Sequence, residues 1–261
     1  MNPLLKVTNQ FIYLGAILST DCTADAEVNN RINKASATFA RIRKRVISSH
    51  NLRLTTKAAV YKAICQSVLL YGIETITVYA RHLKLLERLH MRCVKEILGL
   101  TWRDKVTHTE MLTRVGLQSI ECLIARNQLR WAGHVRRMPV ERYPRRVLYG
   151  QLAEGHRPAH GPKKRYKDRL KKIIRDFGML PDNFESEADD RDGWRAACSQ
   201  GASYFEEERS RLREAKRARR REPRENHSLG DQNWVCHCCR RCKSRIGLFS
   251  HQRTHRTGQD E

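Results

Sequence analysis

The sequence predicts a mostly α-helical protein with a short β element near its N-terminus and a small cysteine-rich unit near its C-terminus. Apolar residues recur every three or four positions in several long stretches, which is the spacing of one buried helix face. A dozen residues rich in Ile, Tyr and Phe precede these stretches, and four cysteines lie within seven residues after them. With 261 residues, 40% of them hydrophobic, the chain is long enough to bury a core and is neither a membrane protein nor plainly disordered.

The N-terminal β element is expected over residues 9–20, where β-branched and aromatic residues surround a glycine and favour a strand or a short hairpin. Thr23 then has the position of an N-cap. Asp25 and Glu27 follow in the first turn, where the helix dipole favours anions. The helical spacing continues to residue 46, so we expect an amphipathic helix of about six turns.

The middle of the chain predicts a series of further helices. Ser119 has the position of an N-cap for a helix that continues to residue 135. Two of the helices before it end at glycines, Gly99 and Gly116, which accept the left-handed backbone that closes a helix. The helices expected before Ser119 cover residues 55–71, 81–98 and 109–115.

The second half of the chain alternates between basic and acidic segments. A helix is expected over residues 163–177, and Trp194 begins a helical stretch that ends as a highly charged helix or a disordered basic tail. Residues 181–192 hold six acids and one base. We interpret them as a solvated acidic loop and not as the metal site of a nuclease, because no suitable framework surrounds them. Five segments result: 1–20 (β), 21–138 (helical), 139–205 (basic, with the acidic loop), 206–233 (charged helix or linker) and 234–261 (the C-terminal unit).

The positive charge of the chain is large and unevenly distributed. Lys and Arg number 51 against 28 Asp and Glu, a formal charge of +23. Nine bases and no acid lie between Glu27 and Glu74, and residues 130–177 hold 15 bases and four acids. Helices of one sign repel themselves, so we infer a polyanionic partner, of which nucleic acid is the commonest. The candidate phosphate-binding residues are Arg31, Lys34, Arg41, Arg43, Lys44, Arg45, Lys57, Lys62, Arg136, Arg137, Lys163, Lys164, Arg165 and Lys167.

Three ring-bearing residues in the basic stretches have two interpretations. Trp131 and His134 lie three residues apart on one helical face, and we expect them to form a core pair rather than to contact a ligand. Tyr166 alternates with lysines and arginines. It therefore either stacks on a nucleic-acid base or packs into the core.

The segment CHCCRRCKSRIGLFSHQRTH predicts a zinc site. A cysteine pair and a histidine pair give C-x2-C-x11-H-x3-H, and Zn²⁺ takes four such sulfur and nitrogen ligands in a tetrahedron. A finger this small cannot bury a core without its metal, so zinc binding and folding should be coupled. The interval between the pairs is one residue shorter than usual, which leaves the choice of cysteines open. The predicted ligands are Cys236, Cys239, His251 and His255, with Cys238, Cys242 and His237 as alternatives.

The other five cysteines are scattered singly, which suits a reducing compartment and not a disulfide scaffold. Three of them, Cys65, Cys93 and Cys122, fall in apolar helical stretches. They are expected to be core thiols without a catalytic role.

Five segments occur in a characteristic order: FIYLGAILSTD with EVNNRINKA, VYKAICQSVLLYGIETITV, LRWAGHVRRMP, GPKKRYKDRLKK, and SRIGLFSHQRTH. Together they resemble the C-terminal part of an endonuclease–reverse transcriptase encoded by a non-LTR (LINE-type) retrotransposon. The resemblance covers most of the chain. It implies that residues 1–20 are the end of a palm, that residues 21–138 form a thumb-like helical bundle, and that residues 234–261 form a C2H2-like zinc finger.

The resemblance also implies a function. A thumb holds a template–primer duplex of RNA or DNA by its backbone. The family's paired metal-binding aspartates lie upstream of YLG, and this chain has no such motif, so we expect a fragment without polymerase activity. We expect a nuclear location, with the cytoplasm as a second one, and no membrane partner. The alternative is a non-catalytic host zinc-finger protein that binds nucleic acid or another protein.

Overall fold

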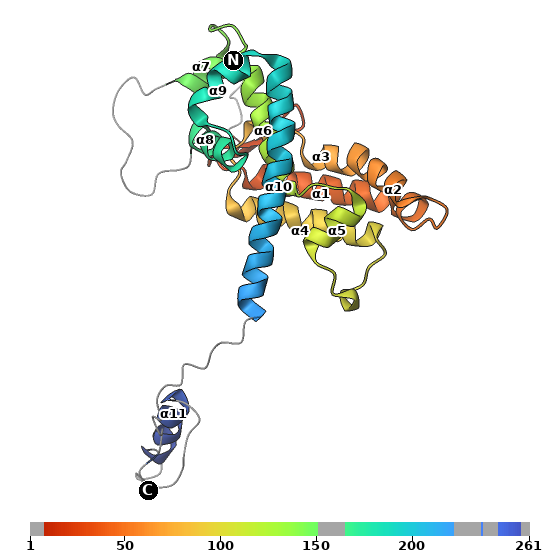
Figure 1. Cartoon of the computed structure of the whole chain (residues 1–261), viewed down its shortest axis with the longest axis vertical. Helices are drawn as coiled ribbons and strands as arrows, with labels where there is room; N and C mark the ends of the chain where they lie inside the picture. Colours follow the sequence, from red (N-terminus) through yellow and green to blue (C-terminus); the bar gives the residue numbers. More distant parts are fainter. Residues whose placement is uncertain (1–7, 151–164, 222–235, 237–244, 257–261) are drawn as a thin grey trace, which may run out of the picture. The chain divides into compact units, whose positions relative to one another are not determined.

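The computed structural model describes residues 8–150, 165–221, 236 and 245–256 (Figure 1). It has two compact units, Met1–Ser210 and Arg211–Glu261. The prediction of a mostly helical protein with a short N-terminal β element is confirmed. The elements are β1 (Gln10–Tyr13), β2 (Ala16–Ser19), α1 (Asp25–Ile42), η1 (Arg43–Ile47), α2 (Leu54–Val60), η2 (Tyr61–Gln66), α3 (Ser67–Leu69), η3 (Ile73–Thr75), α4 (Ala80–Ile97), η4 (Trp102–Asp104), α5 (His108–Val115), α6 (Ile120–Arg136), α7 (Tyr143–Tyr149), α8 (Tyr166–Asp176), η5 (Pro181–Asn183), α9 (Phe184–Asp189), α10 (Arg191–Arg221) and α11 (Arg245–Arg256).

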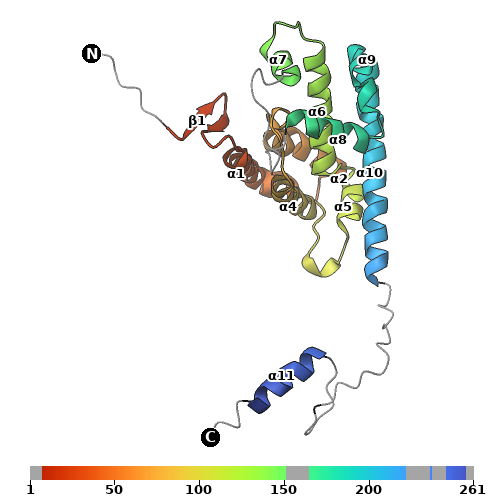
Figure 2. The same ribbon diagram turned by 90° about the vertical axis from the view of Figure 1, so that its left-hand side faces the viewer.

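The β element is an antiparallel hairpin beside the N-terminal part of α1 (Figure 2). Gly15 occupies its turn with φ +81°, a conformation that glycine adopts without a steric cost. Hydrogen bonds attach the hairpin to α1. The Ile17 amide donates a hydrogen bond to the Glu27 carboxylate at 2.7 Å, and Arg31 donates one to the Gly15 carbonyl at 2.7 Å. The predicted hairpin is therefore present and is tethered to the helix through polar groups.

The first hydrophobic cluster gathers residues from the helices between α1 and α6. Tyr61 lies at its centre, 1% exposed, and its hydroxyl makes a 2.8 Å hydrogen bond with Nδ1 of buried His90. The predicted helix ends are confirmed, because Gly99 and Gly116 both have positive φ. The Ser119 cap is confirmed as well, since its hydroxyl accepts a hydrogen bond from the Cys122 amide.

The predicted N-cap at Thr23 is wrong. Helix α1 begins at Asp25, and Ala24 occupies the cap position without a side-chain hydrogen bond. The Thr23 hydroxyl instead donates to the Asp21 carboxylate at 2.9 Å. That carboxylate also accepts a hydrogen bond from the Thr23 amide, so a local turn uses the groups that a cap would need.

The second hydrophobic cluster lies between α6, α8, α9 and α10, and Trp194 fills its centre at 2% exposure. Helix α6 contributes to both clusters, so the predicted segments 21–138 and 139–205 pack into one compact unit. Arg209 on α10 pairs with Glu87 of α4 at 3.0 Å and adds a polar link.

The predicted acidic loop at 181–192 is wrong. Residues 184–189 form helix α9, and α10 begins at residue 191. Phe184 and Ala188 lie four positions apart and are both buried, because this spacing puts them on one helix face. The Phe184 ring meets Trp194 edge to face at 5.3 Å. The acids occupy the other positions of α9, and Glu185 and Asp189 lie 3.8 Å and 3.2 Å from the Arg136 guanidinium.

The prediction of core thiols is confirmed. Cys65, Cys93 and Cys122 are buried, and so is Cys198. Burial raises the pKa of Cys65 to about 11 and the pKa of each of the other three to about 12, because the thiolate is poorly solvated in the core. These thiols are protonated at neutral pH and are unsuited to nucleophilic chemistry.

The described residues of the second unit are the end of α10, Cys236 and α11. Helix α10 continues to Arg221, so the charged stretch after Trp194 is helical at least to that residue. Across all the described residues, no helix combines the length and the apolar character needed to cross a bilayer.

Candidate nucleic-acid interface

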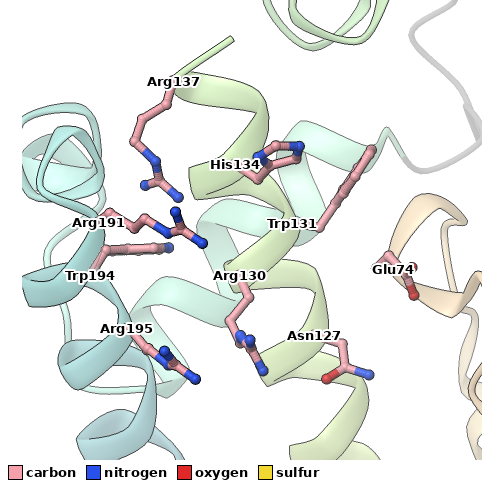
Figure 3. A pocket seen from close by; sticks show the side chains of 9 residues that line it. All are labelled: Glu74, Asn127, Arg130, Trp131, His134, Arg137, Arg191, Trp194 and Arg195. Atoms are coloured by element: carbon pink, nitrogen blue, oxygen red, sulfur yellow. The ribbon is translucent and has the colours of Figure 1, made fainter. Parts of the chain in front are cut away.

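A cavity of about 530 Å³ opens between α6 and the N-terminal part of α10 (Figure 3). Four arginines line it against one carboxylate among its described residues, that of Glu74. Figure 3 shows the four arginine side chains on the side of the cavity nearer to α10. The Trp131 ring and Glu74 lie on the side farther from α10. The lining residues are Glu74, Asn127, Arg130, Trp131, His134, Arg137, Arg191, Trp194 and Arg195.

Helical spacing puts these side chains on one surface. On α6 and at its C-cap, residues 127, 130, 134 and 137 follow each other at three- and four-residue steps, and residue 131 lies next to residue 130. On α10, Arg191 and Arg195 lie one turn apart and flank buried Trp194. The two helices thus each present basic side chains to the same space.

The close approach of α6 and α10 depends on Gly133. A Cβ atom at this position would lie 2.3 Å from Nε1 of Trp194 and 2.4 Å from its Cδ1. The indole therefore lies directly against the α6 backbone. Its Nε1 donates a hydrogen bond to the Leu129 carbonyl at 3.0 Å, which fixes the position of the ring. This contact determines the width of the cavity, because it joins the two helices that carry the arginines.

The arginines of the cavity are available to an anion. Arg130, Arg191 and Arg195 are exposed, and none forms an ion pair with a carboxylate in the part of the chain that the structure describes. Arg137 donates a hydrogen bond to the Ala188 carbonyl, which orients it, and it has no ion pair with a carboxylate within the described ranges. Four guanidinium groups at one opening repel each other in the absence of a ligand. They create a positive potential that a bound anion would relieve.

The expected core pair of Trp131 and His134 is wrong. His134 is exposed and Trp131 is partly exposed, and both line the cavity. Their rings contact each other at 5.5 Å between centroids, with an interplanar angle of 50°. The buried face of α6 is occupied by other residues, among them Leu129 and Ala132, so the two rings are displaced to the surface.

Tyr166 is partly buried, and both interpretations of its ring stay predictions. Its hydroxyl donates to the Glu74 carbonyl at 2.8 Å, and burial raises the pKa of this tyrosine. Its role is to attach α8 to η3 at the edge of the cavity.

A second cavity, of about 540 Å³, shares Glu74 and Asn127 with the first. It extends along α6 toward α3 and includes Lys62 and Arg126. The side-chain amide nitrogen of Gln66 lies in this lining, buried and without a hydrogen-bond partner among the described residues. The shared residues make the two cavities parts of one polar surface.

The predicted basic residues of the α1 region divide into accessible and engaged side chains. Arg31 is 6% exposed and is paired with Glu27, so it cannot contact a phosphate. The prediction that Arg31 binds phosphate is therefore wrong. Arg43 is exposed but lies 2.7 Å from Glu96. Lys57 is partly exposed. The accessible predicted residues on the first helices are Lys34, Arg41, Lys44, Arg45 and Lys62, of which Lys34 and Lys62 also donate to backbone carbonyls.

The predicted residues outside the α1 region have different surroundings. Arg136 pairs with Asp189 at 3.2 Å, and Arg165 with Asp168 at 2.8 Å. Lys167 lies over the Tyr149 ring. Lys163 and Lys164 lie outside the described residues. Within the predicted set, only Arg137 lines the cavity between α6 and α10.

Three of the four arginines of that cavity are not among the residues predicted from sequence to bind phosphate. Arg130 lies in a basic stretch, and Arg191 and Arg195 lie in or beside the acidic segment 181–192. Their i, i+4 spacing around a tryptophan is the signal that could have indicated a common surface. The pairing of that surface with α6 has no sequence signal, because the two helices are some sixty residues apart.

The predicted zinc ligands lie only in part within the described residues. Helix α11 includes both His251 and His255, four positions apart, which is the spacing by which one helix face offers two imidazoles to a metal. Cys236 is buried. The cysteines 238, 239 and 242, the His237 alternative and the His255 side chain lie outside the described residues. Among the residues described, no group of three or more potential ligands is assembled. The histidine spacing fits a zinc ion, and the ligand set stays a prediction.

Comparison with known proteins adds no relative. No protein-family model, no curated protein and no solved structure matches this chain. The functional assignment therefore depends on the residues and their geometry.

Proposed function

We propose that this chain binds RNA or DNA through the phosphate backbone, as the thumb-like C-terminal part of a protein of the non-LTR reverse transcriptase type. The observation that carries the proposal is the cavity with four arginines, none of which pairs with a carboxylate in the described part of the chain. Mutual repulsion of unpaired positive charges destabilises a folded protein, and a bound polyanion would remove that repulsion.

The exposed bases of the first helices support the same proposal. Arg41, Lys44 and Arg45 project from the end of α1 and from η1, and no acid occurs between Glu27 and Glu74. Side chains of this kind contact phosphates without reading bases, which suits a surface that holds any duplex. Each phosphate that they neutralise would release condensed counterions.

The C-terminal unit is proposed as a zinc finger that adds a further nucleic-acid contact. Its metal would supply the fold of this unit, with Cys236, Cys239, His251 and His255 as the ligands. We further propose a nuclear location for the protein. Polymerisation is not part of the proposed function, since the chain has no motif of paired aspartates like that of the family it resembles.

A salt titration tests the proposal. Binding of the full chain to a labelled DNA duplex and to an RNA–DNA hybrid is measured by fluorescence anisotropy at increasing salt. We expect affinity to fall by about 0.9 log units per log unit of salt for each phosphate contacted on B-DNA, with little dependence on sequence. A duplex affinity that is absent at low salt, or that does not change with salt, contradicts the proposal.

A matched pair of double variants tests the surface. Arg41→Ala with Lys44→Ala should weaken duplex binding and reduce the salt slope by about 1.8, because each phosphate that a basic side chain neutralises on B-DNA contributes about 0.9 to the slope. Arg103→Ala with Arg114→Ala removes two exposed charges elsewhere and should leave the slope unchanged. Equal effects of the two double variants would show that net charge, and not this surface, produces the binding.

A further inference from the structure

The cavity between α6 and α10 combines two features that a surface for duplex backbone does not need. The first is a set of arginines collected in a concave space rather than along a convex helix. The second is an indole, Trp131, which lines the cavity and is partly exposed, whereas Leu129 and Ala132 beside it on α6 are buried. We propose that this cavity binds a single-stranded segment of nucleic acid, with one unpaired base against Trp131 and adjacent phosphates at Arg130, Arg191 and Arg195.

The size of the cavity suits this ligand. Its volume of about 530 Å³ falls within the range of roughly 300–1,000 Å³ typical of sites for small ligands. One nucleotide with its flanking phosphates is a ligand of this class. A duplex cannot use the site in the same way, because its bases are stacked on each other and their faces are not available to Trp131.

The polarity of the cavity orients the strand. The arginines lie toward α10, while Trp131 and Glu74 lie away from it (Figure 3). A phosphate is repelled by the Glu74 carboxylate and attracted by the guanidinium groups, so the backbone takes the α10 side. The base then takes the opposite side, where its face meets the indole. A carboxylate accepts hydrogen bonds from base edges and a carboxamide both donates and accepts, so Glu74 and Asn127 are positioned to contact the edge of that base.

The cavity is preorganised by contacts that do not involve its ligand. Trp194 holds α10 against α6 through the Leu129 carbonyl, and Arg137 is oriented by the Ala188 carbonyl. The ring of His134 lies against Trp131 and restricts its rotation. A site whose side chains are already ordered loses less conformational entropy when the ligand binds.

This inference rests on the proposed nucleic-acid function and specifies the ligand at one site. The test therefore separates the two. Full-length chain is titrated with a labelled single-stranded deoxythymidine oligonucleotide and with a DNA duplex, each over a range of salt. Trp131→Ala, Trp131→Phe and the double variant of Arg191→Ala with Arg195→Ala are compared with wild type. Thermal unfolding followed by circular dichroism verifies that each variant is folded.

Stacking and charge have different signatures in this experiment. Trp131→Ala should weaken single-strand binding at least about fivefold, since base–aromatic stacking contributes about 1–3 kcal/mol, and should leave the salt slope unchanged. Trp131→Phe should retain most of the affinity. The double arginine variant should reduce the single-strand salt slope by about 1.4, because each phosphate neutralised on a single strand contributes about 0.7. Arg88→Ala with Arg103→Ala, two exposed arginines outside the cavity lining, is the charge-matched control and should leave that slope unchanged.

Two further outcomes decide the proposal. The ratio of single-strand to duplex affinity should be lower in Trp131→Ala than in wild type, and single-strand binding should quench a tryptophan fluorescence component that Trp131→Phe lacks. If wild type binds duplex but the cavity variants bind single strands as tightly as wild type, the inference is overturned while the proposed function stands. If thymidine monophosphate binds as tightly as the oligonucleotide, the cavity is a site for free nucleotides and the inference is also overturned. If wild type binds neither nucleic acid at low salt, both fail.

Discussion

Replacing Gly133 with Ala tests whether the contact between α6 and Trp194 determines the second core. The added Cβ would lie 2.3 Å from the indole Nε1, far inside van der Waals contact, so one of the two helices must move. Overpacking of this kind costs about 1–3 kcal/mol. Displacing the indole from the Leu129 carbonyl leaves a buried donor unpaired at a further cost of about 1–3 kcal/mol. Alanine offsets about 1 kcal/mol of this loss of stability, because its helix propensity is higher than that of glycine.

The free energy of unfolding should therefore fall by roughly 1–5 kcal/mol in Gly133→Ala. For a protein of this size each kcal/mol lowers the midpoint of thermal unfolding by about 2–4 °C. Urea unfolding followed by circular dichroism measures the change directly. A double-mutant cycle with Trp194→Phe supplies the control, because a smaller ring leaves space for the new methyl group. The penalty of Gly133→Ala should be smaller in that background. A variant that is stabilised by about 1 kcal/mol, with no coupling to residue 194, would refute the packing explanation.

Three further predictions concern charge and thiol chemistry. Hydrogen bonds from Arg81 lower the pKa of Asp25, so the ionised carboxylate stabilises the protein above its ordinary pKa, and this stabilisation is lost as the pH falls through the lowered pKa. Asp25→Asn should therefore be less stable than wild type at pH 7 and equally stable at low pH. Unfolding curves recorded over a range of pH measure the difference. Arg31→Ala should lose about 3–5 kcal/mol of stability because it leaves the buried Glu27 carboxylate without its cationic partner, and a loss below about 1 kcal/mol in urea unfolding would contradict that. Burial raises the pKa of Cys93 to about 12, so this thiol should resist alkylation at pH 8 in the native protein while exposed Cys22 reacts. Mass spectrometry identifies which cysteines are labelled. Rapid labelling of Cys93 would contradict the prediction and indicate a core that opens readily.

The helices of this protein could be predicted from local sequence because the signals that define them are local. The apolar spacing from residue 28 onward, the glycines at 99 and 116, and the cap at Ser119 all act within one or two turns of chain. The same is true of the hairpin, where a glycine lies between two β-rich strands. Thr23 is the exception, because an aspartate two residues away offers its hydroxyl a competing partner and the residue does not cap the helix.

The helix in the acidic stretch could not be predicted for a different reason. The acidic composition indicates a solvated loop, yet Phe184 and Ala188 form an apolar face, and a helix is stable here once that face packs against one neighbouring side chain. That neighbour is the indole of Trp194, on the next helix. An amphipathic signal of two residues is too weak to recognise without its packing partner.

The charge of +23 already indicated a polyanionic partner, because composition alone determines net charge. Tertiary structure decided which of the positive side chains can meet that partner. Arg31 is removed from the surface by Glu27, whereas Arg191 and Arg195 are brought from a mixed-charge segment to the side of Arg130. The physical reason is that ion pairs and cavities form between residues that are distant in the chain, and only the packed backbone determines which of them meet. A glycine at position 133, which local sequence marks only as a weak point in a helix, is what allows these residues to come together.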